Sequence, residues 1–128
     1  MRPQLEMIPA EELAVAAIRT VMITMSPLFR ELVRELIAGH ADLDVVGALD
    51  TRDELREQLR PLAPDVIFIG LGPNEGDEIG SSLVRFLPNT KVIAFSSDMR
   101  HAFVHSMQRH TVLPDVSPRL LIDAVLGP

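Results

Sequence analysis

The chain has 128 residues, of which 47% are hydrophobic and 23% are charged, and its formal net charge is −6. This composition predicts one globular domain and excludes a disordered chain. The excess of acids gives no general attraction to nucleic acid, and the absence of cysteine excludes disulfides and thiolate metal sites.

The first elements along the chain alternate between strand and helix. Residues 18–23 form a short, almost wholly apolar run that is typical of a buried parallel strand. Ser26 followed by Pro27 has the pattern of a helix N-cap, and apolar residues then recur at helical spacing until Gly39. Residues 43–46 indicate a second, shorter strand. We therefore expect a βαβ unit at the start of the fold.

The middle of the chain repeats this alternation. Thr51 and Glu54 have the spacing of a capping box, which predicts a second helix that stops at Pro61. Residues 65–71 predict a third strand, and residues 91–95 predict a fourth. A third helix lies between these two strands, with its apolar positions at Ile79, Leu83 and Phe86.

The last third is predicted to continue in the same way. Residues 99–110 indicate a fourth helix, in which Phe103 and Met107 form an i,i+4 pair. Residues 111–113 predict a very short fifth strand. A second cap-plus-proline pair at positions 117–118 predicts the start of the last helix.

These elements predict an α/β fold: a doubly wound, five-stranded parallel sheet with helices on both faces, as in flavodoxin-like proteins. We expect this domain to span residues 18–128 and residues 1–17 to form an N-terminal extension. Function in such sheets lies at the carboxyl ends of the strands.

Four segments carry a resemblance to a known family: residues 19–37, 63–71, 92–96 and 113–118. The second of them, Ala63-Pro-Asp-Val-Ile-Phe-Ile-Gly-Leu71, resembles the third strand of that family. In order and spacing, the four resemble the receiver domain of response regulators in two-component phosphorelay signal transduction, which is CheY-like in fold. They are most similar to receivers joined to helix-turn-helix output domains, and the resemblance covers about residues 18–126.

The resemblance implies a phosphate-accepting pocket in which four of five functional residues are replaced. Thr24 and Met25 stand where two acids would hold magnesium. Gly70 stands for the phosphoacceptor aspartate, and Pro114, or Leu113 if the register slips by one, stands for the conserved lysine. Ser96 keeps the hydroxyl at the end of the fourth strand. Glycine provides no carboxylate nucleophile, and a hydroxyl with a thioether does not replace two acidic magnesium ligands. We expect an atypical, non-phosphorylatable pseudo-receiver with no catalytic residue, no metal and no cofactor.

Other polar residues near this edge have simpler interpretations. Glu75 and the acids that follow it are expected to interact with the dipole of the third helix. Ser96 is expected to cap the helix after it. His101 and His105 have the i,i+4 spacing of a zinc pair, but a solvated helix face is the expected interpretation, and His110 has no evident partner in sequence.

A receiver without phosphate chemistry would act through protein contacts. The resemblance implies that a protein partner, or a second copy in a homodimer, binds the face made by the fourth helix, fifth strand and last helix. The residues expected on or near that face are Met99, Ala102, Phe103, Met107, Leu120 and Leu121.

Two other functions stay open. The chain could be the receiver portion of a DNA-binding transcriptional regulator whose output domain is absent from it, or a module that binds a small ligand or anion at the strand carboxyl ends. It has no bilayer-spanning apolar run and no signal-peptide pattern. We therefore expect a cytoplasmic protein that is not an enzyme and that binds neither a membrane nor, by itself, nucleic acid.

Overall fold

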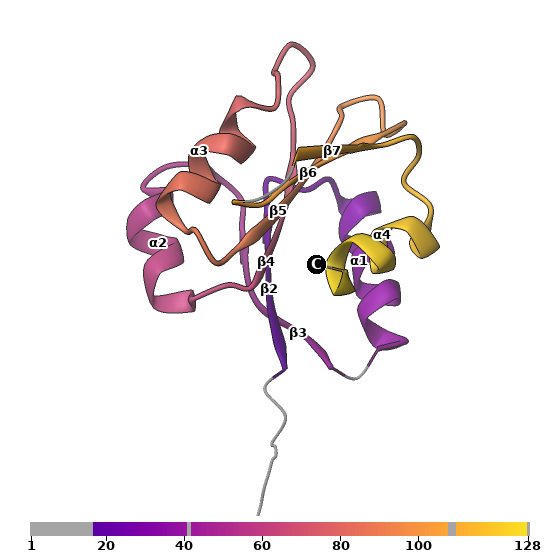
Figure 1. The fold of residues 1–128 in the computed structure, drawn as a ribbon, viewed down its shortest axis with the longest axis horizontal. Helices are drawn as coiled ribbons and strands as arrows, with labels where there is room; N and C mark the ends of the chain where they lie inside the picture. Colours follow the sequence, from indigo (N-terminus) through magenta and orange to yellow (C-terminus); the bar gives the residue numbers. More distant parts are fainter. Residues whose placement is uncertain (1–16, 41, 108–109, 128) are drawn as a thin grey trace, which may run out of the picture.

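Figure 1 shows the computed structural model, which describes residues 17–40, 42–107 and 110–127. A single mixed sheet lies between two helix layers, with α1 and α4 on one face and α2 and α3 on the other. The expected α/β receiver-like fold class is confirmed. Residues 1–16 of the expected N-terminal extension lie outside the described residues. In the described part of the chain, no helix combines the length and the apolar character needed to cross a membrane.

The sheet has six strands in the order β3-β2-β4-β5-β6-β7, one more than expected. Four of them run parallel, as the sequence predicts: β2 (Ile18–Ile23), β3 (Leu43–Leu49), β4 (Val66–Gly70) and β5 (Lys91–Phe95). The hairpin of β6 (Ala102–His105) and β7 (His110–Leu113) then extends the sheet through two antiparallel pairings. The parallel part of the sheet therefore stops at β5.

Four helices cover the sheet: α1 (Pro27–Ala38), α2 (Leu55–Leu62), α3 (Glu78–Phe86) and α4 (Pro118–Leu126). Side chains alternate across the strands, so each face has its own core. Met22, Phe68 and Ile93 pack toward α1 and α4, whereas their neighbours pack toward α2 and α3. Burying each such side chain stabilises the fold by about 1.5–3 kcal/mol. Both faces of the central strands therefore pack against helices through a hydrophobic core.

The predicted serine caps are confirmed. The Ser26 hydroxyl accepts a 3.3 Å hydrogen bond from the Phe29 N–H at the start of α1, and the Ser117 hydroxyl accepts an equally long one from the Leu120 N–H of α4. In both helices a proline occupies the first turn, where its missing N–H removes no helical hydrogen bond. These caps fix where the two helices leave the sheet edge.

The predicted capping box of α2 is wrong. Thr51 Oγ1 accepts from the Asp53 N–H at 3.2 Å, which closes a local turn in place of a helix cap. Glu54 precedes α2 with a left-handed φ of 55° and makes no side-chain cap. Pro61 lies inside the last turn of α2, so the helix ends one residue later than expected, at Leu62.

The predicted fourth helix over residues 99–110 is also wrong, because a turn and a strand take its place. Asp98 Oδ1 accepts hydrogen bonds from Ser96 Oγ at 2.6 Å and from the Arg100 N–H at 3.0 Å. Met99 has a left-handed φ of 64°, which is incompatible with a position inside a right-handed helix. Residues 102–105 then pair with β5 in the sheet. Residues 108 and 109 of the predicted helix lie outside the described residues.

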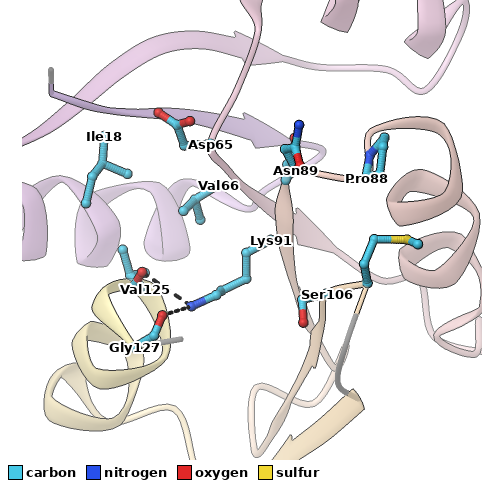
Figure 2. Close-up of a pocket in the computed structure, with 11 residues that line it drawn as sticks. Ile18, Asp65, Val66, Pro88, Asn89, Lys91, Ser106, Val125 and Gly127 are labelled. Atoms are coloured by element: carbon cyan, nitrogen blue, oxygen red, sulfur yellow. Dashed lines mark hydrogen bonds between the residues drawn. The ribbon is translucent and has the colours of Figure 1, made fainter.

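Lys91 occupies the amino edge of the sheet, opposite the edge where receiver chemistry is expected (Figure 2). Its Nζ donates to the carbonyl oxygens of Gly127 at 2.7 Å and Val125 at 3.4 Å, and also to that of Ala124. The residue lines a hollow of about 420 Å³, and burial lowers the pKa of its ammonium group. Lys91, the single lysine of the sequence, thus caps the C-terminus of α4.

Candidate functional site at the carboxyl edge of the sheet

The parallel strands end at the edge where the sequence predicts a degenerate pocket. Thr24 follows β2, Gly70 ends β4 and Ser96 follows β5, and all three line a hollow of about 150 Å³. Met25 is only 4% exposed and packs in the core on the α1 side, outside this hollow. The structure therefore brings three of the five predicted pocket residues together.

Gly70 is held against the backbone of Thr24. A Cβ atom at position 70 would lie 2.6 Å from the Thr24 carbonyl oxygen, closer than real Cβ contacts come. Thr24 itself adopts a left-handed φ of 48°, which is an outlier for a β-branched residue, and its hydroxyl donates to the Gly70 carbonyl oxygen at 3.1 Å. The two strand ends therefore approach too closely for any side chain at position 70 unless the backbone moves.

An ion pair between Arg52 and Glu75 closes the same edge. Arg52 Nη2 donates to the Gly70 carbonyl oxygen at 2.6 Å, and its Nε donates to Thr24 Oγ1 at 3.4 Å. The guanidinium also pairs with Glu75, whose other carboxylate oxygen accepts a 2.9 Å hydrogen bond from the Gly72 N–H. The Arg52 hydrogen bond lowers the pKa of Glu75 despite an opposing effect of burial.

This ion pair is the part of the site that the sequence does not reveal. Arg52 lies in the loop after β3 and Glu75 in the loop after β4, and no motif in either loop predicts that the two side chains pair. Glu75 is expected to interact with the dipole of the third helix, but the structure directs its carboxylate to Arg52 and to the Gly72 amide. The two loops meet because β3 and β4 flank β2 in the sheet.

Ser96 closes a turn and caps no helix. Its hydroxyl donates to Asp98 Oδ1 and accepts a 3.2 Å hydrogen bond from the His101 N–H, and the His101 carbonyl oxygen lies 3.0 Å away. These contacts tie the end of β5 to the start of β6. The expected role as a helix cap is wrong because no helix follows.

Pro114 is displaced from the other pocket residues by the hairpin. Leu113 at the end of β7 pairs with Ala102, and Ala102 pairs with Phe95 at the end of β5. Pro114 thus follows a strand two places from β5, roughly 10 Å away at the usual strand spacing. It is exposed and is not among the residues that line the hollow. The family's lysine position has therefore moved away from the strand edge where its charge would act.

The expected contact face includes a fourth helix, but residues 102–105 of that segment form β6. Ala102 and Leu121 are both fully buried, so they belong to the core and cannot contact a partner. Met99, Phe103 and Leu120 are half-buried. Of the six residues, Met107 is the most accessible, at 60% exposed, and it lies just beyond β6.

The comparison with known proteins rests on a solved structure, because no protein-family model and no curated protein matches the sequence. The structure is similar to the signal receiver domain of the response regulator NarL from Mycobacterium tuberculosis, with a TM-score of 0.52 and 25% sequence identity over 64% of this chain and 68% of that chain. The strand order β3-β2-β4-β5 and this structural neighbour show that the chain has the CheY-like fold of a response-regulator receiver domain.

Proposed function

We propose that this receiver domain is not phosphorylated and that it signals through protein contacts, without enzymatic activity. The observation that carries the proposal is the 2.6 Å approach between the Thr24 carbonyl oxygen and the Cβ position of Gly70. Acyl-phosphate chemistry needs a carboxylate at the end of β4, and this approach leaves no room for one.

The charges around the hollow support the same proposal. Magnesium binding requires carboxylate oxygens, but Thr24 and Ser96 bring only hydroxyls to the hollow. The nearby carboxylate of Glu75 is already engaged by Arg52, and the guanidinium of Arg52 is engaged by Glu75 and Gly70 in turn. This mutual pairing argues against both a phosphoryl group and a free anion as the signal.

The hairpin supplies the surface that supports a contact function. β7 is the edge strand of the sheet, and Val112 on it is 51% exposed. Met107, between the two strands of the hairpin, is 60% exposed. An edge strand can pair with the same strand of a second copy, because an antiparallel pair of identical strands is self-complementary. A homodimer through β7 is therefore the contact that we propose.

Phosphorylation is tested by incubating the chain with acetyl phosphate and magnesium and measuring its intact mass. We expect an unchanged mass under conditions that modify an active receiver used as the positive control. A stable phosphoryl adduct would overturn the proposal. The variants Glu75→Gln and Asp98→Asn then test whether either of these two carboxylates near the edge is the acceptor.

The contact function is tested by measuring the solution mass over a range of concentrations. We expect the mass to rise toward that of a dimer in the wild type and to stay monomeric in Val112→Lys. Leu28→Lys is the matched control, since Leu28 is 66% exposed on α1 and does not belong to the hairpin. A monomer at every concentration, or equal effects of both variants, would refute the homodimer.

A further inference from the structure

Three possible metal ligands lie together on the α3 face of the sheet. Asp77 directly precedes α3, His105 ends β6 and His110 begins β7. Their ligand atoms all lie within 4.8 Å of one another. The two histidines are paired across the hairpin, with ring centroids 4.4 Å apart, so both rings stand on one face of the sheet. None of the three residues lines the hollow at the carboxyl edge.

His105 is the buried member of the cluster, at 3% exposed. Its Nε2 atom is enclosed and has no hydrogen-bond partner among the described residues. Ser81 Oγ lies 3.5 Å from its Nδ1, and Gly80 makes room for the ring, because any Cβ at position 80 would collide with the imidazole. An enclosed ring nitrogen without a partner is unfavourable, and a cation between the three groups would satisfy it.

The distances suit a tetrahedral ion. Zinc binds histidine nitrogen and carboxylate oxygen at about 2.0–2.2 Å, which places neighbouring ligand atoms roughly 3.4 Å apart. His105 Nε2 lies 3.4 Å from Asp77 Oδ2, and His110 Nε2 lies 2.8 Å from the same oxygen. The Asp77 side chain makes no cap to α3, so its carboxylate is available. A small opening of the Asp77–His110 pair would bring its 2.8 Å separation to the same value.

The protonation state of His105 also suits a ligand. Burial lowers its pKa, the neighbouring His110 lowers it further, and Asp77 opposes both effects. The ring is therefore neutral near pH 7, which is the form that binds a metal ion.

We propose that Asp77, His105 and His110 form a zinc-binding site. His110 is 51% exposed on its side chain, so the fourth position of the ion opens toward solvent and takes a water molecule. The ion would connect the β6–β7 hairpin to the start of α3. Without it, Asp77 and His110 are joined only by a single exposed hydrogen bond. This inference does not depend on whether the receiver is phosphorylated.

The test uses the full chain after chelator treatment and dialysis, titrated with Zn²⁺ in a calorimeter. We expect one ion per chain and a higher melting temperature with zinc than without it. Replacing zinc by Co²⁺ is expected to give the visible absorption of a tetrahedral site. Absence of both binding heat and a melting shift at saturating Zn²⁺ would overturn the proposal.

Variants separate this site from adventitious binding. His110→Ala and Asp77→Asn remove one ligand each at accessible positions, so the fold is expected to persist without metal. Each should weaken zinc binding by about tenfold or more. The control His40→Ala removes a histidine far from the cluster in sequence, in the segment between α1 and β3, and should bind zinc like the wild type. Unchanged affinity in both ligand variants, or an equal loss in His40→Ala, would refute the site.

Discussion

Arg52 Nη2 donates a 2.6 Å hydrogen bond to the carbonyl oxygen of Gly70, the residue that stands at the phosphoacceptor position. The same guanidinium pairs with Glu75 from the next loop. A cation and a carboxylate are thus paired at the strand edge where the receiver resemblance implies that a phosphoryl charge comes and goes.

Arg52→Ala should destabilise the domain. The substitution leaves the Gly70 carbonyl oxygen and the Glu75 carboxylate without their shared donor. We expect a loss of about 1–3 kcal/mol in the free energy of unfolding, measured by urea denaturation. Arg34→Ala is the control, because among the described residues Arg34 forms only an exposed pair with Glu31, at 4.0 Å. It should change stability by less than about 0.5 kcal/mol. Equal losses would contradict the role assigned to Arg52.

Gly70→Ala should lower the free energy of unfolding even though it adds only one methyl group. The new Cβ meets the Thr24 carbonyl oxygen at 2.6 Å, so a backbone segment must shift. We expect a loss of about 1–3 kcal/mol in urea denaturation. Gly39→Ala is the matched control, because its nearest neighbour would lie at 3.6 Å and its φ of −82° suits alanine. A stability of Gly70→Ala equal to that of Gly39→Ala would show that the strand ends separate freely.

The stability of the metal-free chain should fall in mild acid. Burial lowers the pKa of His105 below its ordinary value of 6.5, so the unfolded chain takes up a proton at a higher pH than the folded chain. The contribution of His105 is complete above pH 6.5 and is lost as the pH falls through the lowered folded pKa. Asp77 and His110 are the titratable groups that face the ring, and they act in opposite directions on it.

Urea denaturation with a chelator present, between about pH 8 and pH 3, measures this dependence. His105→Asn should show a flatter dependence than the wild type. A second decrease is expected below pH 4.5, because the hydrogen bond from Arg52 lowers the pKa of Glu75 from that value. Identical profiles for the wild type and His105→Asn would contradict the assignment to His105.

Lys91→Met should loosen the last helix. Methionine keeps the apolar stem but removes the donor that satisfies three carbonyl oxygens at the end of α4. We expect a loss of about 1–3 kcal/mol and faster amide hydrogen exchange in α4. Arg85→Met, at an exposed position of α3, should change neither quantity. Unaltered exchange in α4 of Lys91→Met would contradict the capping role.

The parallel half of the fold could be predicted because its local signals agree with its final packing. The runs 18–23 and 91–95 are apolar enough to indicate strands buried on both faces, and the structure has strands with the same bounds. Ser26 and Ser117 begin their helices as the pattern of cap and proline indicates. Thr24 follows one parallel strand and Gly70 ends another, so their place at the functional edge could also be predicted from the topology.

The hairpin and the charged pair could not be predicted, because each depends on contacts between distant segments. Phe103 and Met107 suit a helix in spacing, but the Asp98 turn and pairing with β5 decide the conformation. His110 gains its neighbour His105 only across that hairpin. Arg52 meets Glu75 only after two strands have taken places on either side of β2.

The hairpin also affects how the chain is expected to fold. The pairing of Val104 with Thr111 joins residues close in sequence, whereas the pairing of Thr20 with Val66 must close a long loop. Short loops close at a lower entropic cost, and folding rates rise as contacts become more local. Because the sheet ends in the β6–β7 hairpin, this edge of the sheet forms through pairings between residues that are close in sequence. The slow steps of folding are then expected to be the parallel pairing of the central strands and the packing of the end of α4 against Lys91.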